Sequence, residues 1–217
     1  RNMYKNFEKG RSMIEMLGVL AIIGVLSVGG IAGYSKAMEK WKTNRAIEDY
    51  SLLIHGLLEH IDDIHKLPQP DPVGLTEIAN SLNLIPNTWE ILNEAYLHDA
   101  YGNTIGLSVH RQEGDMPARI SFDLQLGGIQ TADNGSYSPA FSVRLCRSLF
   151  TDLIMPINSS IWATAVNQKK SGWINYYSNS WCGGNNKCLG DLTITQIDDL
   201  CRSCDGSKEA CSVNISF

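Results

Sequence analysis

The chain contains an uninterrupted run of nineteen residues without a charge, from Met16 to Tyr34. As an α-helix this run would be about 28 Å long, close to the ~30 Å thickness of a membrane's hydrocarbon core. A cleaved secretory signal is the main alternative, but its apolar stretch is usually about 7–15 residues long. No clear small-residue cleavage site precedes the polar continuation; Gly29, Gly30 and Gly33 come nearest to one. We therefore predict a retained membrane helix.

The rest of the chain has the composition of an ordinary folded domain. The whole sequence has 217 residues, of which 43% are hydrophobic and 19% charged, and its net charge is −5. This apolar content excludes a wholly disordered chain. The acidic balance argues against a nucleic-acid partner, because contacts to phosphates require a basic surface.

The charges beside the apolar run do not fix its orientation in a membrane. Residues 1–12 and residues 35–45 each carry four basic residues and one acidic residue, so the positive-inside rule gives no preference. The cysteines decide instead, because clustered thiols behind a membrane anchor indicate an oxidising compartment. We expect the polar part, which holds all six, to lie outside the cytoplasm: Cys146, Cys182, Cys188, Cys201, Cys204 and Cys211.

Glu15 lies at the start of the apolar run, between Ile14 and Met16. An ionised carboxylate costs about 2.5–3.5 kcal/mol at the centre of a membrane helix and less near its edge. The side chain therefore either reaches the headgroup layer or pairs with a cation inside the membrane. Cleavage of the chain after Gly10 would create a terminal amine at Arg11, four residues before Glu15.

The segment from Gly10 to Leu17 has the sequence GRSMIEML, and GVLAIIGVL follows it. This start of the chain resembles the start of a type IV prepilin. The resemblance implies that a prepilin peptidase cuts after Gly10 and leaves Glu15 as the fifth residue of the mature chain. It also implies that the helix that follows assembles into a filament. Gly24 falls in the part that matches the family's helix body.

The segment departs from the family at two positions. Arg11 stands where the family prefers an apolar residue that is then N-methylated, and Ala32 replaces the helix proline of many type IVa pilins. Gly29, Gly30 and Gly33 resemble the glycines of type IVb pilins, where the helix loosens during fibre assembly. The spacing of Gly29 and Gly33 also permits close packing between helices. Because the chain begins with arginine, we expect the leader, residues 1–10, to be incomplete.

Beyond the membrane run, residues 35–66 are expected to continue the helix as an amphipathic segment. Apolar residues recur there mostly at three- and four-residue steps, which predicts one buried stripe. Three prolines after Leu67 end the helix, since proline lacks a backbone donor. The stripe consists of Met38, Trp41, Ile47, Tyr50, Ile54, Leu57, Ile61 and Ile64.

Residues 67–217 are expected to form a globular α+β head, an antiparallel sheet on the upper part of the helix with a cysteine-rich C-terminal region. Alternation predicts strands at 104–109, 118–124, 161–166, 173–177 and 211–217. Helices are expected at 77–82, capped by Thr76, at 141–153 and at 193–201, with a further helical turn or two at 87–95.

The cysteine spacing leaves three interpretations open. A zinc site is suggested by Cys201-x2-Cys204, but a second tight pair is missing. A redox pair would require a βαβ unit, which the pattern lacks. Structural disulfides are favoured, and six cysteines allow fifteen pairings. We expect Cys146 to pair with one cysteine of the C-terminal cluster.

No sequence motif indicates catalysis, so we expect neither enzymatic activity nor a cofactor or resident metal. The spacing of His60 and His65 directs the two rings apart on a helix, which favours a solvated face. Calcium binding by carboxylates is a weaker alternative that would use Asp191, Asp198 and Asp199, which lack EF-hand spacing. The aromatic residues near them are expected in the core or at subunit contacts, with a carbohydrate-facing surface as the alternative: Trp173, Tyr176, Tyr177 and Trp181.

These observations predict a structural subunit of a type IV pilus of the IVb kind. Its partners would be other copies in a helical filament, prepilin peptidase, the inner-membrane assembly machinery and, before assembly, membrane lipid. Its location would be the bacterial inner membrane and then the extracellular pilus, serving adhesion, aggregation, motility or DNA uptake. The alternatives are a minor pilin or tip adhesin, and a type II secretion pseudopilin.

Overall fold

The computed structural model describes residues 13–67, 72–133, 135–168, 172–204 and 210–217. Two units follow each other along the chain, the first ending at Lys42 and the second, here called the sheet domain, running from Thr43 to Phe217. Helix α1 (Met13–Glu59) contributes to both units. The helix ends at Glu59, before the predicted boundary at Lys66, and a short helix α2 (Ile61–Ile64) follows it.

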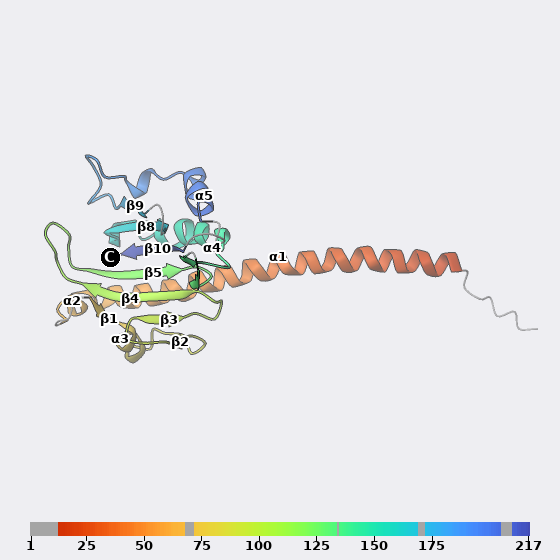
Figure 1. Ribbon diagram of the computed structural model, residues 1–217, viewed down its shortest axis with the longest axis horizontal. Helices are drawn as coiled ribbons and strands as arrows, with labels where there is room; N and C mark the ends of the chain where they lie inside the picture. Colours follow the sequence, from red (N-terminus) through yellow and green to blue (C-terminus); the bar gives the residue numbers. More distant parts are fainter. Residues whose placement is uncertain (1–12, 68–71, 134, 169–171, 205–209) are drawn as a thin grey trace, which may run out of the picture. The chain divides into compact units, whose positions relative to one another are not determined.

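The sheet domain is built on one eight-stranded sheet in which every pair of neighbours is antiparallel (Figure 1). The strand order is β2-β3-β4-β5-β10-β8-β9, and β1 pairs with β4 beside β3. The strands are β1 (Val73–Gly74), β2 (Glu90–Ile91), β3 (Tyr96–His98), β4 (Thr104–His110), β5 (Arg119–Gln125), β8 (Ala163–Gln168), β9 (Gly172–Tyr177) and β10 (Cys211–Ser216). The expected α+β class with an antiparallel sheet is confirmed.

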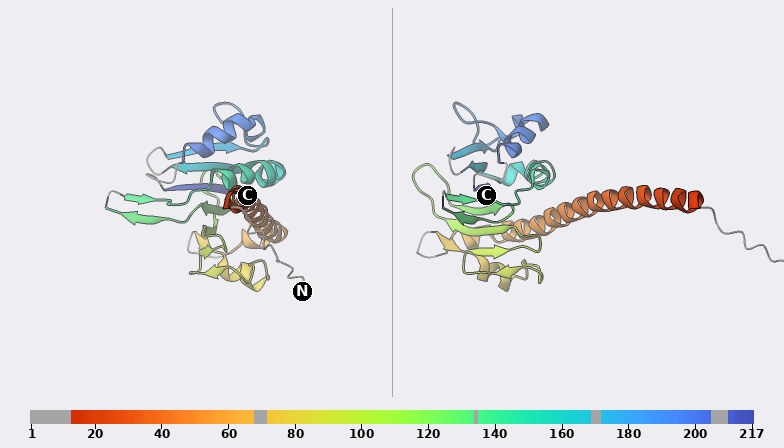
Figure 2. Two further views of the ribbon diagram at one scale, coloured as in Figure 1. Left: turned by 90° about the vertical axis from the view of Figure 1, so that its right-hand side faces the viewer. Right: turned by 45° about the vertical axis from the view of Figure 1, so that its right-hand side comes forward.

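Smaller elements lie at the two ends of this sheet (Figure 2). Helix α3 (Thr76–Ser81) lies by the short strands β1–β3, whereas α4 (Val143–Ser148) and α5 (Ile194–Arg202) lie by β8 and β9. A separate hairpin is formed by β6 (Gln130–Ala132) and β7 (Gly135–Tyr137). A π-helical turn, Leu149–Ile154, extends α4, and single 3-10 turns occupy Asn158–Ser160 and Leu189–Asp191.

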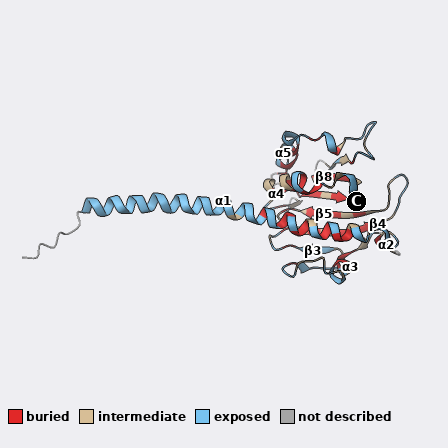
Figure 3. Cartoon of the chain, turned by 180° about the vertical axis from the view of Figure 1, so that it is seen from behind, coloured by how far each residue is buried: buried red, intermediate tan, exposed pale blue. Residues whose placement is uncertain are grey.

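The core of the sheet domain lies between one face of the sheet and the part of α1 that follows Thr43 (Figure 3). Strands β4 and β5 alternate buried and half-buried residues along their whole length, as expected when only one face meets the core. Tyr50, Leu53 and Leu57 of α1 are fully buried against this face. The predicted stripe is thus confirmed from Ile47 onward, but Trp41 is 57% exposed.

Two predicted helical features are wrong, and hydrogen bonds to the side chain and to the backbone carbonyl of Asn93 explain them. Residues 87–95 do not form helical turns; β2 pairs with β3 in a hairpin instead. The Asn93 side chain accepts hydrogen bonds from the backbone nitrogens of Ala95 and Tyr96, a local turn that competes with helix. Thr76 is the first residue of α3 and not its cap, because its hydroxyl donates to the Asn93 carbonyl at 2.7 Å.

The other predicted helices are present, with their starts set by capping side chains. Helix α4 begins at Val143 because the Ser142 hydroxyl accepts from Leu145 N at 3.1 Å. Helix α5 begins after Thr193, whose side chain and that of Gln196 cap each other's backbone nitrogens. The strands predicted from alternation are also present, with bounds that differ by one or two residues.

Candidate functional site

The first half of α1 presents apolar side chains to its surroundings. Over the described residues 13–34, thirteen large apolar side chains are each more than half exposed. None of the eighteen residues in the most apolar window is buried, and α1 is the described helix that is long and apolar enough to cross a membrane. A surface of this kind is stable only when lipid or other protein covers it.

Glu15 lies exposed in the first turn of α1. A carboxylate at this position interacts favourably with the positive end of the helix dipole. The two residues expected to take part in processing, Gly10 and Arg11, lie outside the described residues. Within the described chain, Glu15 is the first acidic residue of the helix, and its four nearest neighbours in sequence are apolar.

The glycines of this half are open on their Cβ side. Apart from the adjacent residues and the backbone of its own helical turns, an added Cβ at Gly24, Gly29, Gly30 or Gly33 would meet no atom of the described residues within 4 Å. Each glycine costs about 1 kcal/mol of helix propensity relative to alanine in water. Their small size therefore serves no side-chain contact within the described chain.

The six cysteines form three disulfides, Cys146–Cys201, Cys182–Cys188 and Cys204–Cys211, and none is free. The predicted link from Cys146 to the C-terminal cluster is confirmed. It joins α4 to α5, and both of its cysteines are fully buried. Since every thiol is bridged, the zinc and redox interpretations have no ligand or nucleophile among these residues.

Of the carboxylates considered for calcium, Asp198 takes part in an ion-pair network between α4 and α5, whereas Asp191 and Asp199 are exposed. Asp198 accepts from Arg202 at 2.7 Å and lies 3.1 Å from Arg147. The hydrogen bond from Arg202 is the main reason that the pKa of Asp198 lies below its usual value. Among the residues that the structure describes, no group of histidine, cysteine and acidic side chains has the geometry of a metal site.

Of the four aromatic residues near the C-terminus, Tyr176 and Tyr177 are half-buried, and Tyr176 packs against the core. Trp173 is 51% exposed and Trp181 is 45% exposed, so neither lies in the core. The Trp162 ring lies edge-on to both Tyr177 and Trp181, with ring centres 5.6 and 6.5 Å apart. These three rings contact one another at the edge of the sheet domain. Tyr177 therefore has a packing role, whereas Trp181 lies at the surface.

A buried hydrogen-bond network, which sequence reasoning missed, joins α1 to the loop between β3 and β4. The Tyr50 hydroxyl donates to Asp99, and the Asn103 side-chain nitrogen donates to the same carboxylate at 2.7 Å. Asp99 also accepts from the backbone nitrogens of Tyr101 and Asn103 at 2.8 and 2.9 Å. Burial, together with the Asp99 charge, raises the pKa of Tyr50 well above its usual value, so the phenol remains a donor.

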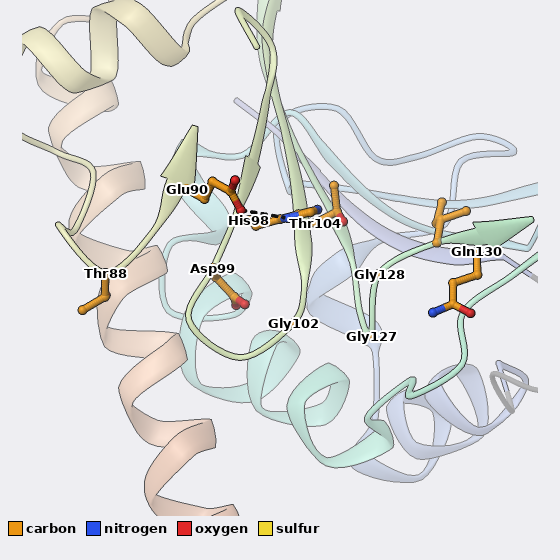
Figure 4. A pocket seen from close by; sticks show the side chains of 10 residues that line it. Thr88, Glu90, His98, Asp99, Gly102, Thr104, Gly127, Gly128 and Gln130 are labelled. Atoms are coloured by element: carbon orange, nitrogen blue, oxygen red, sulfur yellow. Dashed lines mark ion pairs between the residues drawn. The ribbon is translucent and has the colours of Figure 1, made fainter. Parts of the chain in front are cut away.

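This network also supports a pocket of about 410 Å³ in the sheet domain (Figure 4). The Asn103 side-chain oxygen accepts from Gly127 N at 2.9 Å, which ties the β3–β4 loop to the turn after β5. The pocket is lined by Thr88, Glu90, His98, Asp99, Gly102, Thr104, Gly127, Gly128, Ile129 and Gln130. No sequence motif marks it, because its residues meet only through the register of the strands.

No protein-family model, curated protein or solved structure matches the chain. The architecture itself, a long N-terminal apolar helix followed by an antiparallel sheet domain with three disulfides, is compatible with a pilin. It is also compatible with membrane insertion of α1.

Proposed function

We propose that the chain is a structural subunit of a type IV pilus. The observation that carries the proposal is the exposed apolar half of α1, which is uncharged from Met16 to Tyr34 and has Glu15 in its first turn, five residues after Gly10. Such a segment requires an apolar environment, and its carboxylate requires a cation in that environment. A second copy of the chain, cleaved after Gly10, would supply both.

In this proposal, prepilin peptidase at the inner membrane frees the amine of Arg11. Glu15 of an entering subunit then pairs with the amine of a neighbour already in the filament. A buried ion pair offsets the cost of the two charges only when they meet, so it selects one axial offset between neighbouring helices. The sheet domain, with its disulfides, then faces the extracellular side of the filament.

The apolar exposure supports a filament as well as a lipid anchor, so the carboxylate provides the sharper test. We expect Glu15→Gln to leave cleavage after Gly10 intact and to reduce surface filaments at least about tenfold, since the ion pair loses its charge. Glu59→Gln makes the same change at an exposed site at the other end of α1 and should leave filaments unchanged. Electron microscopy and immunoblotting of sheared filaments provide the measurement.

N-terminal mass spectrometry of the surface-exposed protein completes the test. We expect the mature chain to begin at Arg11, and the same spectrum shows whether its amine is methylated. Normal piliation of Glu15→Gln would refute the role of the carboxylate. A surface protein that retains residues 1–10 would refute the proposed processing.

A further inference from the structure

We propose that the pocket between β2, β3, β4 and the turn after β5 binds a neutral sugar ring, either free or at the end of a glycan. Its volume of about 410 Å³ falls within the range of roughly 300–1,000 Å³ that small-molecule sites occupy. The pocket lies wholly within the sheet domain. The inference therefore does not depend on whether α1 assembles into a filament.

The register of three strands places polar side chains side by side along the pocket. Glu90 lies opposite His98, and His98 lies opposite Thr104 (Figure 4). Because neighbouring strands are about 4.8 Å apart, the row from Glu90 to Thr104 spans roughly 10 Å. A row of a carboxylate, an imidazole and a hydroxyl offers both donors and acceptors, which is what the hydroxyl groups of a sugar require.

The charges of the lining favour a neutral ligand over an anion. The lining contains the carboxylates of Glu90 and Asp99 and no lysine or arginine. Asp99 already accepts four hydrogen bonds, so it supports the wall and is not available to a ligand. Glu90 is the remaining carboxylate, and His98 Nδ1 lies 3.7 Å from its Oε2. A phosphate or carboxylate ligand would find repulsion here, whereas a hydroxyl could donate to Glu90.

The opposite wall offers an amide and one apolar side chain. The Gln130 side-chain oxygen accepts from the Tyr137 hydroxyl at 3.1 Å, which leaves its NH2 group as a donor. Ile129 is the one large apolar side chain of the lining, and it is 41% exposed. A sugar ring has an apolar C–H face as well as its hydroxyls, and Ile129 can contact that face.

Glycine backbone forms the floor, and the buried network holds it in place. Gly127 has φ +81°, and an added Cβ would lie 2.5 Å from the Ala140 carbonyl carbon, so only glycine fits. Asn103 holds this turn through Gly127 N, and Asp99 holds Asn103. A site whose floor is fixed before binding loses less conformational entropy when a ligand enters.

The test is an NMR titration of the full chain, solubilised in nonionic detergent micelles. It follows the chemical shifts of the backbone amides of Gly102, Gly127 and Gly128. The probes are glucose, galactose, mannose, N-acetylglucosamine and N-acetylgalactosamine, with spermidine as a cationic competitor. We expect at least one sugar to shift these signals in a saturating manner with a dissociation constant of about 1 mM, typical of a ligand of this size.

Glu90→Gln combined with Thr104→Val should weaken the binding about tenfold or more, because two hydrogen bonds are lost. The matched control makes the same two changes at exposed positions outside the lining, Glu94→Gln and Thr131→Val, and should bind as the unmodified chain does. Glu90→Gln alone should weaken binding by a smaller factor, and it provides a second variant if the double one is unstable.

A parallel measurement on immobilised glycans with the same terminal sugars distinguishes the two sources of the ring. If the chain is retained on the immobilised glycans, the ligand is the end of a glycan. If the chain binds sugar in solution but is not retained on the glycans, the ligand is a free sugar. Both results support the inference. Signals that respond to spermidine but to none of the sugars would overturn it, and so would equal binding by the pocket variant and the control.

Discussion

Removal of the Cys146–Cys201 disulfide should cost the sheet domain far more stability than removal of Cys182–Cys188. A disulfide reduces the entropy of the unfolded chain, and the reduction grows with the length of chain that it closes. The two bridges join residues 55 and 6 positions apart. The loop-closure relation then gives about 4 kcal/mol for the first and about 2 kcal/mol for the second.

Burial increases this difference. Cys146 and Cys201 are both fully buried between α4 and α5, and Cys182 and Cys188 are half-buried. Replacing each pair by two alanines leaves no unpaired thiol, but in the buried pair it also leaves a cavity, which adds to the cost. We therefore expect a difference of at least about 2 kcal/mol between the two double variants.

The assay is urea unfolding of the full chain in detergent micelles, followed by tryptophan fluorescence. The free energy of unfolding is obtained from the midpoint and the slope of each curve. The unmodified chain and the Cys182→Ala/Cys188→Ala variant serve as references. Equal losses for the two pairs, or a smaller loss for Cys146→Ala/Cys201→Ala, would refute the reasoning from loop length and burial.

Two other buried groups permit equally direct tests. Tyr50→Phe removes a donor from the buried Asp99 carboxylate and should destabilise the sheet domain by about 1–3 kcal/mol. The control Tyr34→Phe changes a 68% exposed position and should cost little stability. Equal urea midpoints for the two variants would contradict this prediction. Burial raises the pKa of Asp123 above its ordinary value of 3.8, so between these two pKa values the folded chain holds a proton that the unfolded chain releases. The protonated carboxyl contributes stability that is fully present below the ordinary pKa and is lost as pH rises through the pKa of the folded chain. Asp123→Asn should therefore gain stability relative to the unmodified chain between pH ~4 and pH ~7, as shown by urea midpoints at both pH values, and a difference independent of pH would contradict this.

Much of the fold could be predicted because the pattern that encodes it is local. Strands β4 and β5 alternate apolar and polar residues over seven positions, and the structure buries the same alternate residues. Helix α5 carries a capping box, which the structure forms in full. Signals of this kind depend on neighbours in sequence, so they survive without knowledge of the tertiary fold.

The wrong predictions arose where a particular contact, and not a periodic pattern, decides the outcome. Strand β2 has two residues, too few for any periodicity, and it exists because it pairs with β3. Thr76 resembles a helix cap in sequence, but its hydroxyl is used by Asn93, seventeen residues away. The pocket was missed for the same reason, since Glu90, His98 and Thr104 become neighbours only through strand register.

The apolar residues of α1 separate, in the structure, into a buried and an exposed group. From Ile47 onward the sheet domain supplies the covering surface, whereas over residues 13–34 the covering surface comes from outside the described chain. Lipid and the helices of other copies cover apolar side chains about equally well, because lipid tails are as apolar as leucine. The apolar residues therefore cannot themselves favour a filament over a membrane. That preference has to come from groups that lipid does not satisfy, namely a carboxylate at Glu15 and the bare backbone at Gly29 and Gly33, where another helix can approach closely.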